Sequence, residues 1–100
     1  MNMQQMMAQA QKMQRELQKA MKELEEKEFT ITKGGAVTVK MYGSTKIISV
    51  SIDEDAFDKE NKEMVEELIA LAINEGIDTI EAEREAINEK ITGRSGGFGF

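Results

Sequence analysis

Cysteine, histidine, proline and tryptophan are all missing from the 100 residues of this chain. Without cysteine, disulfides and thiolate metal sites are excluded, and a reducing cytoplasm is the expected setting. Without histidine, the chain lacks the most common general base and the most common transition-metal ligand of proteins. No serine can therefore have a histidine partner, and no pair of carboxylates stands out as catalytic. We expect no enzyme, no metal, no cofactor and no small-molecule substrate.

Long hydrophobic runs and aromatic residues are also scarce. The longest apolar run, Leu68 to Ile73, is far shorter than the roughly 20 residues that cross a membrane. The first residues contain glutamines where a secretory signal would place an apolar stretch. We therefore expect a soluble, cytoplasmic protein without membrane contact. Only 5% of the residues are aromatic but eight are methionine, a composition that favours helices packed on one another.

The net charge of −6 argues against a nucleic-acid partner until its distribution is considered. Residues 1–22 carry four cations and one anion, a local charge of +3, so the other 78 residues carry −9. From Ile47 onward, 14 acidic residues accompany 5 basic ones. This asymmetry predicts one basic working face on an acidic body.

The first segment predicts one long helix from about Asn2 to Lys27, because it is rich in helix formers and contains no glycine or β-branched residue. Its apolar side chains recur at alternating steps of three and four residues, which is the spacing of a coiled-coil seam. A second chain could cover such a seam, so we predict homodimerisation. The dimerisation residues would be Met6, Ala10, Met13, Leu17, Ala20 and Leu24.

The next segment changes to the alternation typical of strands. Residues 29–33, 36–41 and 46–52 alternate apolar and polar side chains and predict three short strands. Gly34-Gly35 and residues 42–44 supply the turns between them. We expect an antiparallel meander with one face covered by helix.

An acidic segment, residues 53–58, separates the strands from a second helix. It does not fit a calcium-binding loop, because an aspartate takes the place of the loop glycine and a methionine that of the last glutamate. We interpret it as a turn that caps the helix. The second helix runs from about residue 60 to about residue 92, either unbroken or bent at Gly76, and we favour one long helix.

These segments predict an α+β protein with a long N-terminal helix, a three-stranded antiparallel meander and a long C-terminal helix. Residues 1–92 would form a single α-β-β-β-α domain, and residues 93–100 a flexible tail of glycine and phenylalanine. The tail resembles an RNA-binding stretch only weakly. A disordered end, or docking of Phe98 and Phe100 on the dimer, is the simpler interpretation.

Four cations of the first helix share one side. In the heptad frame, Lys12 and Lys19 take one position and Arg15 and Lys22 its neighbour, opposite the seam. Such a row suits DNA phosphates, although lysine and arginine are also common on ordinary solvated helix faces. Arg84 interrupts the apolar spacing of the second helix, where we expect it to pair with an acid or reach the edge.

The order of these parts resembles the YbaB/EbfC nucleoid-associated proteins over nearly the whole chain. The resemblance rests on MQQMMAQAQKMQRELQKAMKELEE, VTVKMYG, ISVSID and KEMVEELIALAIN, of which the last is the most specific. It implies an intertwined or tweezer-like homodimer that binds double-stranded DNA with little sequence preference and affects nucleoid organisation or gene expression. On that basis the DNA-binding candidates are Lys12, Arg15, Lys19 and Lys22, followed by Lys33, Lys40, Lys46, Arg84, Lys90 and Arg94.

The chain departs from that family in two ways. Family members often end in a proline-containing tail, whereas this chain ends GFGF. Its acidic second half would also repel DNA, so we expect modest, salt-sensitive binding through the first helix. The alternative is an acidic helical adaptor that holds another protein and does not bind DNA.

Overall fold

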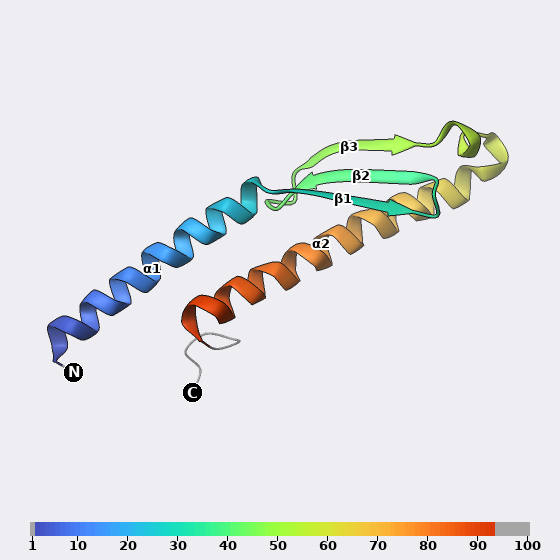
Figure 1. Cartoon of the computed structure of the whole chain (residues 1–100). Helices are drawn as coiled ribbons and strands as arrows, with labels where there is room; N and C mark the ends of the chain where they lie inside the picture. The colour runs from blue at the N-terminus through green and yellow to red at the C-terminus, as the bar shows by residue number, and fades with distance from the viewer. Residues whose placement is uncertain (1, 94–100) are drawn as a thin grey trace.

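A computed structural model describes residues 2–93 of the chain, so the predicted tail, Arg94 included, lies almost wholly outside the described residues. Two long helices and a three-stranded antiparallel sheet confirm the predicted α+β fold (Figure 1). The elements are α1 (Met3–Glu26), β1 (Glu28–Lys33), β2 (Val37–Tyr42), β3 (Ile47–Ile52), the 3₁₀ turns η1 (Glu54–Ala56) and η2 (Lys59–Asn61), and α2 (Lys62–Thr92).

Helix α1 projects from one end of the sheet. Its first turn is capped by the Asn2 side chain, whose oxygen accepts a hydrogen bond of 2.8 Å from the backbone N–H of Gln5. Residues 2–12 are all exposed, and Leu24 in the last turn is the one buried residue of the helix. The C-terminal half of α2 extends from the same end of the sheet, beside α1 (Figure 1). The two helices together form a projecting arm.

The meander follows from its turn residues. Gly34 and Gly35 have φ of 61° and 62°, so both central positions of the turn from Lys33 to Ala36 have the positive φ that glycine adopts readily. The backbone N–H of Ala36 closes the turn on the carbonyl of Lys33 at 3.0 Å. On the side of the sheet that faces α2, the buried side chains are Phe29, Ile31, Val37, Val39 and Met41.

The turn between β2 and β3 attaches the sheet to the end of α1. The backbone N–H of Gly43 donates to the carbonyl of Lys27 at 2.8 Å, and that of Ser44 donates to the carbonyl of Glu25 at 3.2 Å. A Cβ on Gly43 would lie only 1.8 Å from the carbonyl oxygen of Leu24. Glycine is needed here because two backbones approach each other, and this contact sets the direction in which α1 leaves the sheet.

Helix α2 is unbroken over 31 residues, which confirms the preference for one long helix. Gly76 is buried where the helix comes nearest to the sheet. A Cβ there would lie 2.6 Å from Cε of Met41 and 2.9 Å from Cδ1 of Ile31. The glycine that weakens the helix locally is therefore what lets it approach β1 and β2.

We expect Gly76→Val to lower the free energy of unfolding by about 1 to 3 kcal/mol, because the added atoms overfill this contact. Gly76→Ala should lower the free energy of unfolding by less. Its Cβ meets only flexible side-chain ends, and alanine adds about 1 kcal/mol of helix propensity that offsets this collision. Urea denaturation of both variants measures the difference. A valine variant as stable as the unchanged protein would contradict the close approach.

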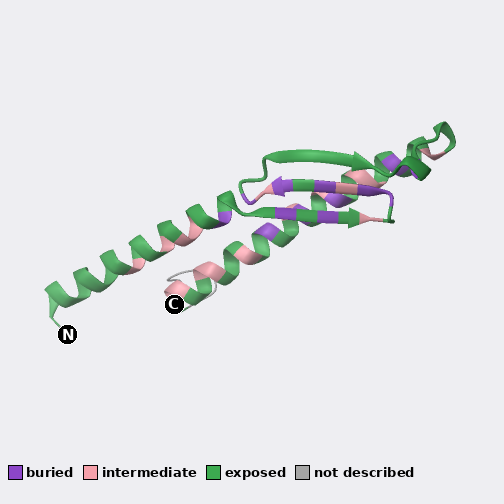
Figure 2. Ribbon diagram, turned by 45° about the horizontal axis from the view of Figure 1, so that its top comes forward, coloured by how far each residue is buried: buried purple, intermediate pink, exposed green. Residues whose placement is uncertain are grey.

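Helix α2 covers β1 and β2 but leaves β3 bare. Figure 2 shows β3 exposed along its whole length, whereas both other strands carry buried residues. Val50 and Ile52 pair with the fully buried Val39 and Val37, yet remain 43% and 36% exposed. The expectation that helix covers the whole face was therefore wrong for β3. One helix is about 10 Å wide, which suffices for two strands about 4.8 Å apart but not for a third.

The acidic segment before α2 forms turns, as predicted, but its aspartates cap the two 3₁₀ turns and not α2, whose N-cap residue Asn61 makes no capping hydrogen bond with its side chain. An oxygen of Asp53 accepts a hydrogen bond of 2.9 Å from the backbone N–H of Asp55. An oxygen of Asp58 accepts one of the same length from the backbone N–H of Glu60. These two aspartates start η1 and η2, and α2 begins at Lys62, two residues later than predicted.

Candidate nucleic-acid interface

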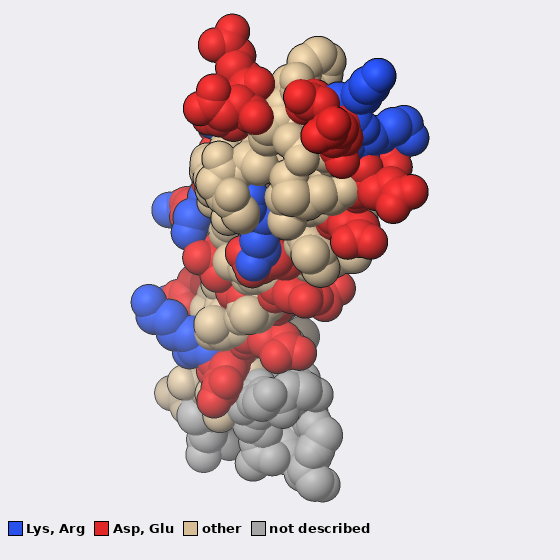
Figure 3. All heavy atoms as spheres, turned by 90° about the vertical axis from the view of Figure 1, so that its right-hand side faces the viewer, with Lys and Arg blue, Asp and Glu red and all other residues tan. Residues whose placement is uncertain are grey.

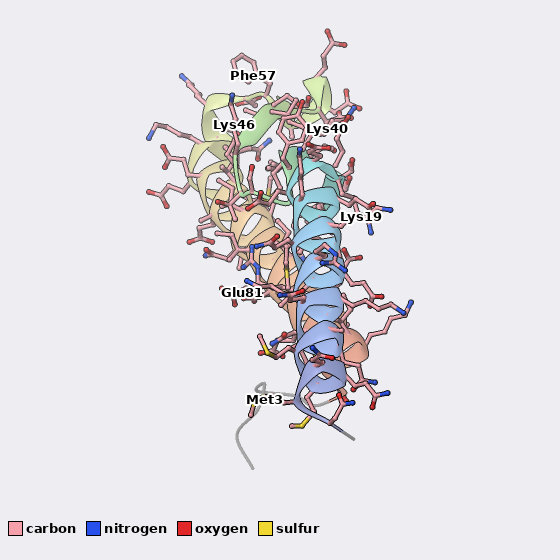
Figure 4. All side chains as sticks on the ribbon, turned by 90° about the vertical axis from the view of Figure 1, so that its left-hand side faces the viewer. Met3, Lys19, Lys40, Lys46, Phe57 and Glu81 are labelled. Carbon is pink, nitrogen blue, oxygen red and sulfur yellow. The ribbon has the colours of Figure 1, made fainter. Side chains whose placement is uncertain are left out.

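The outer side of α1 carries a basic row, by which we mean Lys12, Arg15, Lys19 and Lys22. All four are exposed, as the heptad frame predicts. From Lys12 to Lys22 they extend over ten helical steps, or about 15 Å of helix. Figure 4 shows the labelled Lys19 directed away from α2. Within residues 2–93 none of the four forms an ion pair, so each charge is available to an anionic partner.

The other side of α1 turns partly toward α2. Leu24 is buried, and Leu17 and Ala20 are half-buried, whereas Met6 at the far end is 58% exposed. An ion pair of 2.7 Å between Lys27 and Glu83 joins the base of α1 to α2. The C-terminal half of the predicted dimerisation seam thus packs within its own chain. Homodimerisation through the seam stays a prediction.

Two sheet lysines lie next to the end of the basic row. Lys46 belongs to the turn that is hydrogen-bonded to the last turn of α1, and Lys40 points from the face of β2 opposite α2. Both are exposed and lie beyond the C-terminal end of α1 (Figure 4). Three glutamates, at positions 23, 25 and 26, separate Lys22 from them. The positive charge is therefore strongest along the middle of α1.

The remaining candidates lie apart from the basic row. Lys33 forms an ion pair with Glu75 of α2. Arg84 and Lys90 are exposed on α2, a helix rich in carboxylates. Arg84 forms no ion pair with any residue that the structure describes, so it reaches solvent, the second of the two expectations for it. DNA contact at these three positions stays a prediction.

The far end of the molecule is acidic. Figure 3 looks onto this end, where η1, η2 and the start of α2 lie, and shows carboxylates around an uncharged area. The acidic residues there would repel a duplex. Among the described residues, no cluster of acidic side chains could hold a metal ion, and no helix is long and apolar enough to cross a membrane.

Sequence reasoning missed two apolar hollows. One, of about 530 Å³, lies between α1 and the last turn of α2. The other, of about 450 Å³, lies between β3 and α2 beside Phe57, whose side chain is 78% exposed. The signal for the first was the apolar seam itself. The signal for the second was Phe57, an aromatic residue in an otherwise acidic segment.

Comparison with known proteins agrees with these features. A model of the YbaB/EbfC DNA-binding family matches residues 1–95. A nucleoid-associated protein of Clostridium novyi is 45% identical over 94 residues, which cover 93% of this chain and 82% of that protein. A nucleoid-associated protein of Malacoplasma penetrans is 39% identical over 89 residues, which cover 89% of this chain and 95% of that protein. The crystal structure of an uncharacterised Helicobacter pylori protein has the same fold, with a TM-score of 0.73 at 22% identity over 91% of this chain and 97% of that one.

Proposed function

The chain belongs to the YbaB/EbfC DNA-binding family, and we propose that it is a homodimeric nucleoid-associated protein that grips double-stranded DNA through phosphate contacts. The observation that carries this proposal is the basic row, four exposed cations without ion pairs in the described part of the chain. Its place of action would be the nucleoid of the cytoplasm, where it would affect DNA organisation or gene expression.

Little sequence preference follows from the kind of contact. Lysine and arginine side chains that meet phosphates fix the position of a protein on DNA but read no sequence. Among residues 2–93, the largely exposed aromatic side chain, Phe57, lies at the acidic end, away from the basic row. A stacking contact with bases is therefore not supported on α1.

The homodimer is supported by the shape of the single chain. Its radius of gyration is 19.2 Å, whereas a compact chain of 100 residues has about 13 Å. The chain also presents a bare apolar face on β3, and β3 is an edge strand with unpaired backbone groups. Exposed apolar edges of this kind usually pair or are protected. A second copy that added its own β3 would cover the apolar face and pair the backbone groups of the edge.

We expect Val50→Lys to dissociate this dimer, because a charge would then have to be buried between the two β3 faces. The side chain is already 43% exposed in one chain, so the subunit should remain folded. Ser49→Lys is the matched control, since the adjacent side chain points to the opposite side of the sheet. Light scattering should give one chain mass of 11.2 kDa for the first variant and twice that for the control. A dimeric Val50→Lys variant would favour the α1 seam as the interface.

DNA binding is tested by fluorescence anisotropy with a random 30-base-pair duplex at low and moderate salt. We expect saturable binding that weakens steeply as salt rises, because phosphate contacts release counterions. A second duplex of unrelated sequence should bind with similar affinity.

The absence of binding at low salt would leave the adaptor as the better function. The observation that favours an adaptor is the acidic end with its uncharged centre (Figure 3). A pull-down from nuclease-treated lysate separates the two functions, since an adaptor would retain its protein partner.

A further inference from the structure

The arm contains an apolar groove with no occupant assigned by the proposed function. It lies between α1 and the end of α2, has a volume of about 530 Å³, and carries no charged side chain. We call it the arm groove. Its lining residues are Met6, Gln9, Ala10, Met13, Gln14 and Leu17 of α1 and Thr92 of α2.

The chain leaves α2 at the edge of this groove. Thr92 itself lines the groove, and Gly93 follows in the left-handed conformation with φ of 74°, which ends the helix. Seven residues, 94–100, lie beyond Gly93. An extended chain of that length reaches up to about 23 Å. The α1 lining from Met6 to Leu17 is about 16 Å long, so the tail can reach all of it.

The chemistry of the tail matches that of the groove. Residues 94–100 contain two phenylalanines, no acid and one cation next to the helix end. Met6 and Met13 offer thioethers, which make favourable contacts with aromatic rings and adapt to irregular shapes. We propose that Phe98 and Phe100 dock in the arm groove of their own chain and brace α1 against α2.

The other conceivable occupant is α1 of a second copy. The seam residues nearest the sheet already pack on α2, and Leu24 is only 3% exposed. The fully exposed part of α1, from Met3 to Lys12, is 10 residues long, whereas a coiled coil needs about three heptads. A short apolar tail fills so short a stripe better than a second long helix.

A disulfide tests this docking cleanly, because the chain has no natural cysteine. In the whole chain, Gln9→Cys is combined with Gly99→Cys, which keeps both phenylalanines and both methionines, and the protein is oxidised under mild conditions. The matched control combines Ala8→Cys with Gly99→Cys, since Ala8 is exposed on the opposite side of α1. We expect a cross-linked product of one chain mass at least about tenfold faster for the first pair than for the control, because docking raises the local concentration of the two thiols.

Equal rates for the two pairs, or no cross-link in either, would overturn the proposal. A product of two chain masses would also overturn it, by showing that a partner chain occupies the groove. A second readout is amide hydrogen exchange of residues 6–17, which should become faster when Phe98 and Phe100 are both replaced by serine. Unchanged exchange would contradict docking. Neither measurement uses DNA, so a failure of the docking proposal can be told apart from a failure of the DNA-binding proposal.

Discussion

Replacement of Lys12, Arg15, Lys19 and Lys22 by glutamine is expected to weaken DNA binding at least about 100-fold at moderate salt, and replacement by glutamate to abolish it. Each phosphate contact contributes about 0.9 to the slope of log affinity against log salt, so four lost contacts remove about 3.6 from that slope per chain. Glutamine keeps the helix propensity of lysine and arginine. The side chains are exposed, so the fold should survive. Anisotropy titrations at several salt concentrations measure both effects.

The matched control is the double variant Lys59→Glu, Lys62→Glu at the acidic end. The quadruple glutamine variant and this control both change the net charge from −6 to −10, since four neutral substitutions and two charge reversals each lower the net charge by four. Among residues 2–93, the control breaks the exposed ion pair of Lys62 with Glu66, which contributes little to stability. It should bind DNA nearly normally. Equal losses in both variants would show that overall charge, and not the basic row, governs binding.

Gly43→Ala is expected to destabilise the protein by about 3 kcal/mol or more, near the upper end of single substitutions. The new Cβ would lie 1.8 Å from the carbonyl oxygen of Leu24. That atom belongs to the backbone, so relief requires α1 and the turn to separate. The two hydrogen bonds that the turn donates to Lys27 and Glu25 would be lost with the contact. Urea denaturation followed by circular dichroism gives the change in free energy.

Gly35→Ala provides the comparison. Its φ of 62° strains an alanine, but a Cβ there meets nothing within 4 Å. We expect the free energy of unfolding to fall by about 1 kcal/mol, because only the backbone conformation is strained. The two variants therefore separate collision from conformational strain. Similar losses for both would contradict the close approach of the turn to α1.

The regular elements of this fold are predictable from local chemistry. Helix formers without interruption predict α1 to within one residue at each end, and Gly34-Gly35 predicts a hairpin whose glycines do have positive φ. The second turn was predicted at residues 42–44, but its left-handed residue is Thr45. Gly43 instead serves a contact with α1, which is distant in sequence. Local pattern cannot predict that role, because it depends on how two elements pack.

The same limit applies to the site. Heptad spacing places the basic row on the outer side of α1, and the exposure of its side chains confirms this. Periodicity also predicts that one side of α1 and one face of β3 are apolar. It does not predict which element covers them. Leu24 is buried within its own chain, whereas the side chain of Val50 remains 43% exposed. The width and direction of α2 cause this difference.

If the basic row binds DNA as proposed, its shortness would limit how firmly one chain holds a duplex. About 15 Å of helix corresponds to four or five base pairs, because each strand of the duplex presents a phosphate every 3.4 Å. One arm with so small a footprint would leave the duplex readily, and the second arm of a dimer would add avidity through its high effective concentration. The fraction of the DNA that is covered would then depend on how many copies of the protein the cell contains. Such a protein would behave as an abundant, mobile coat that exchanges along DNA, in contrast to a repressor that resides at one operator.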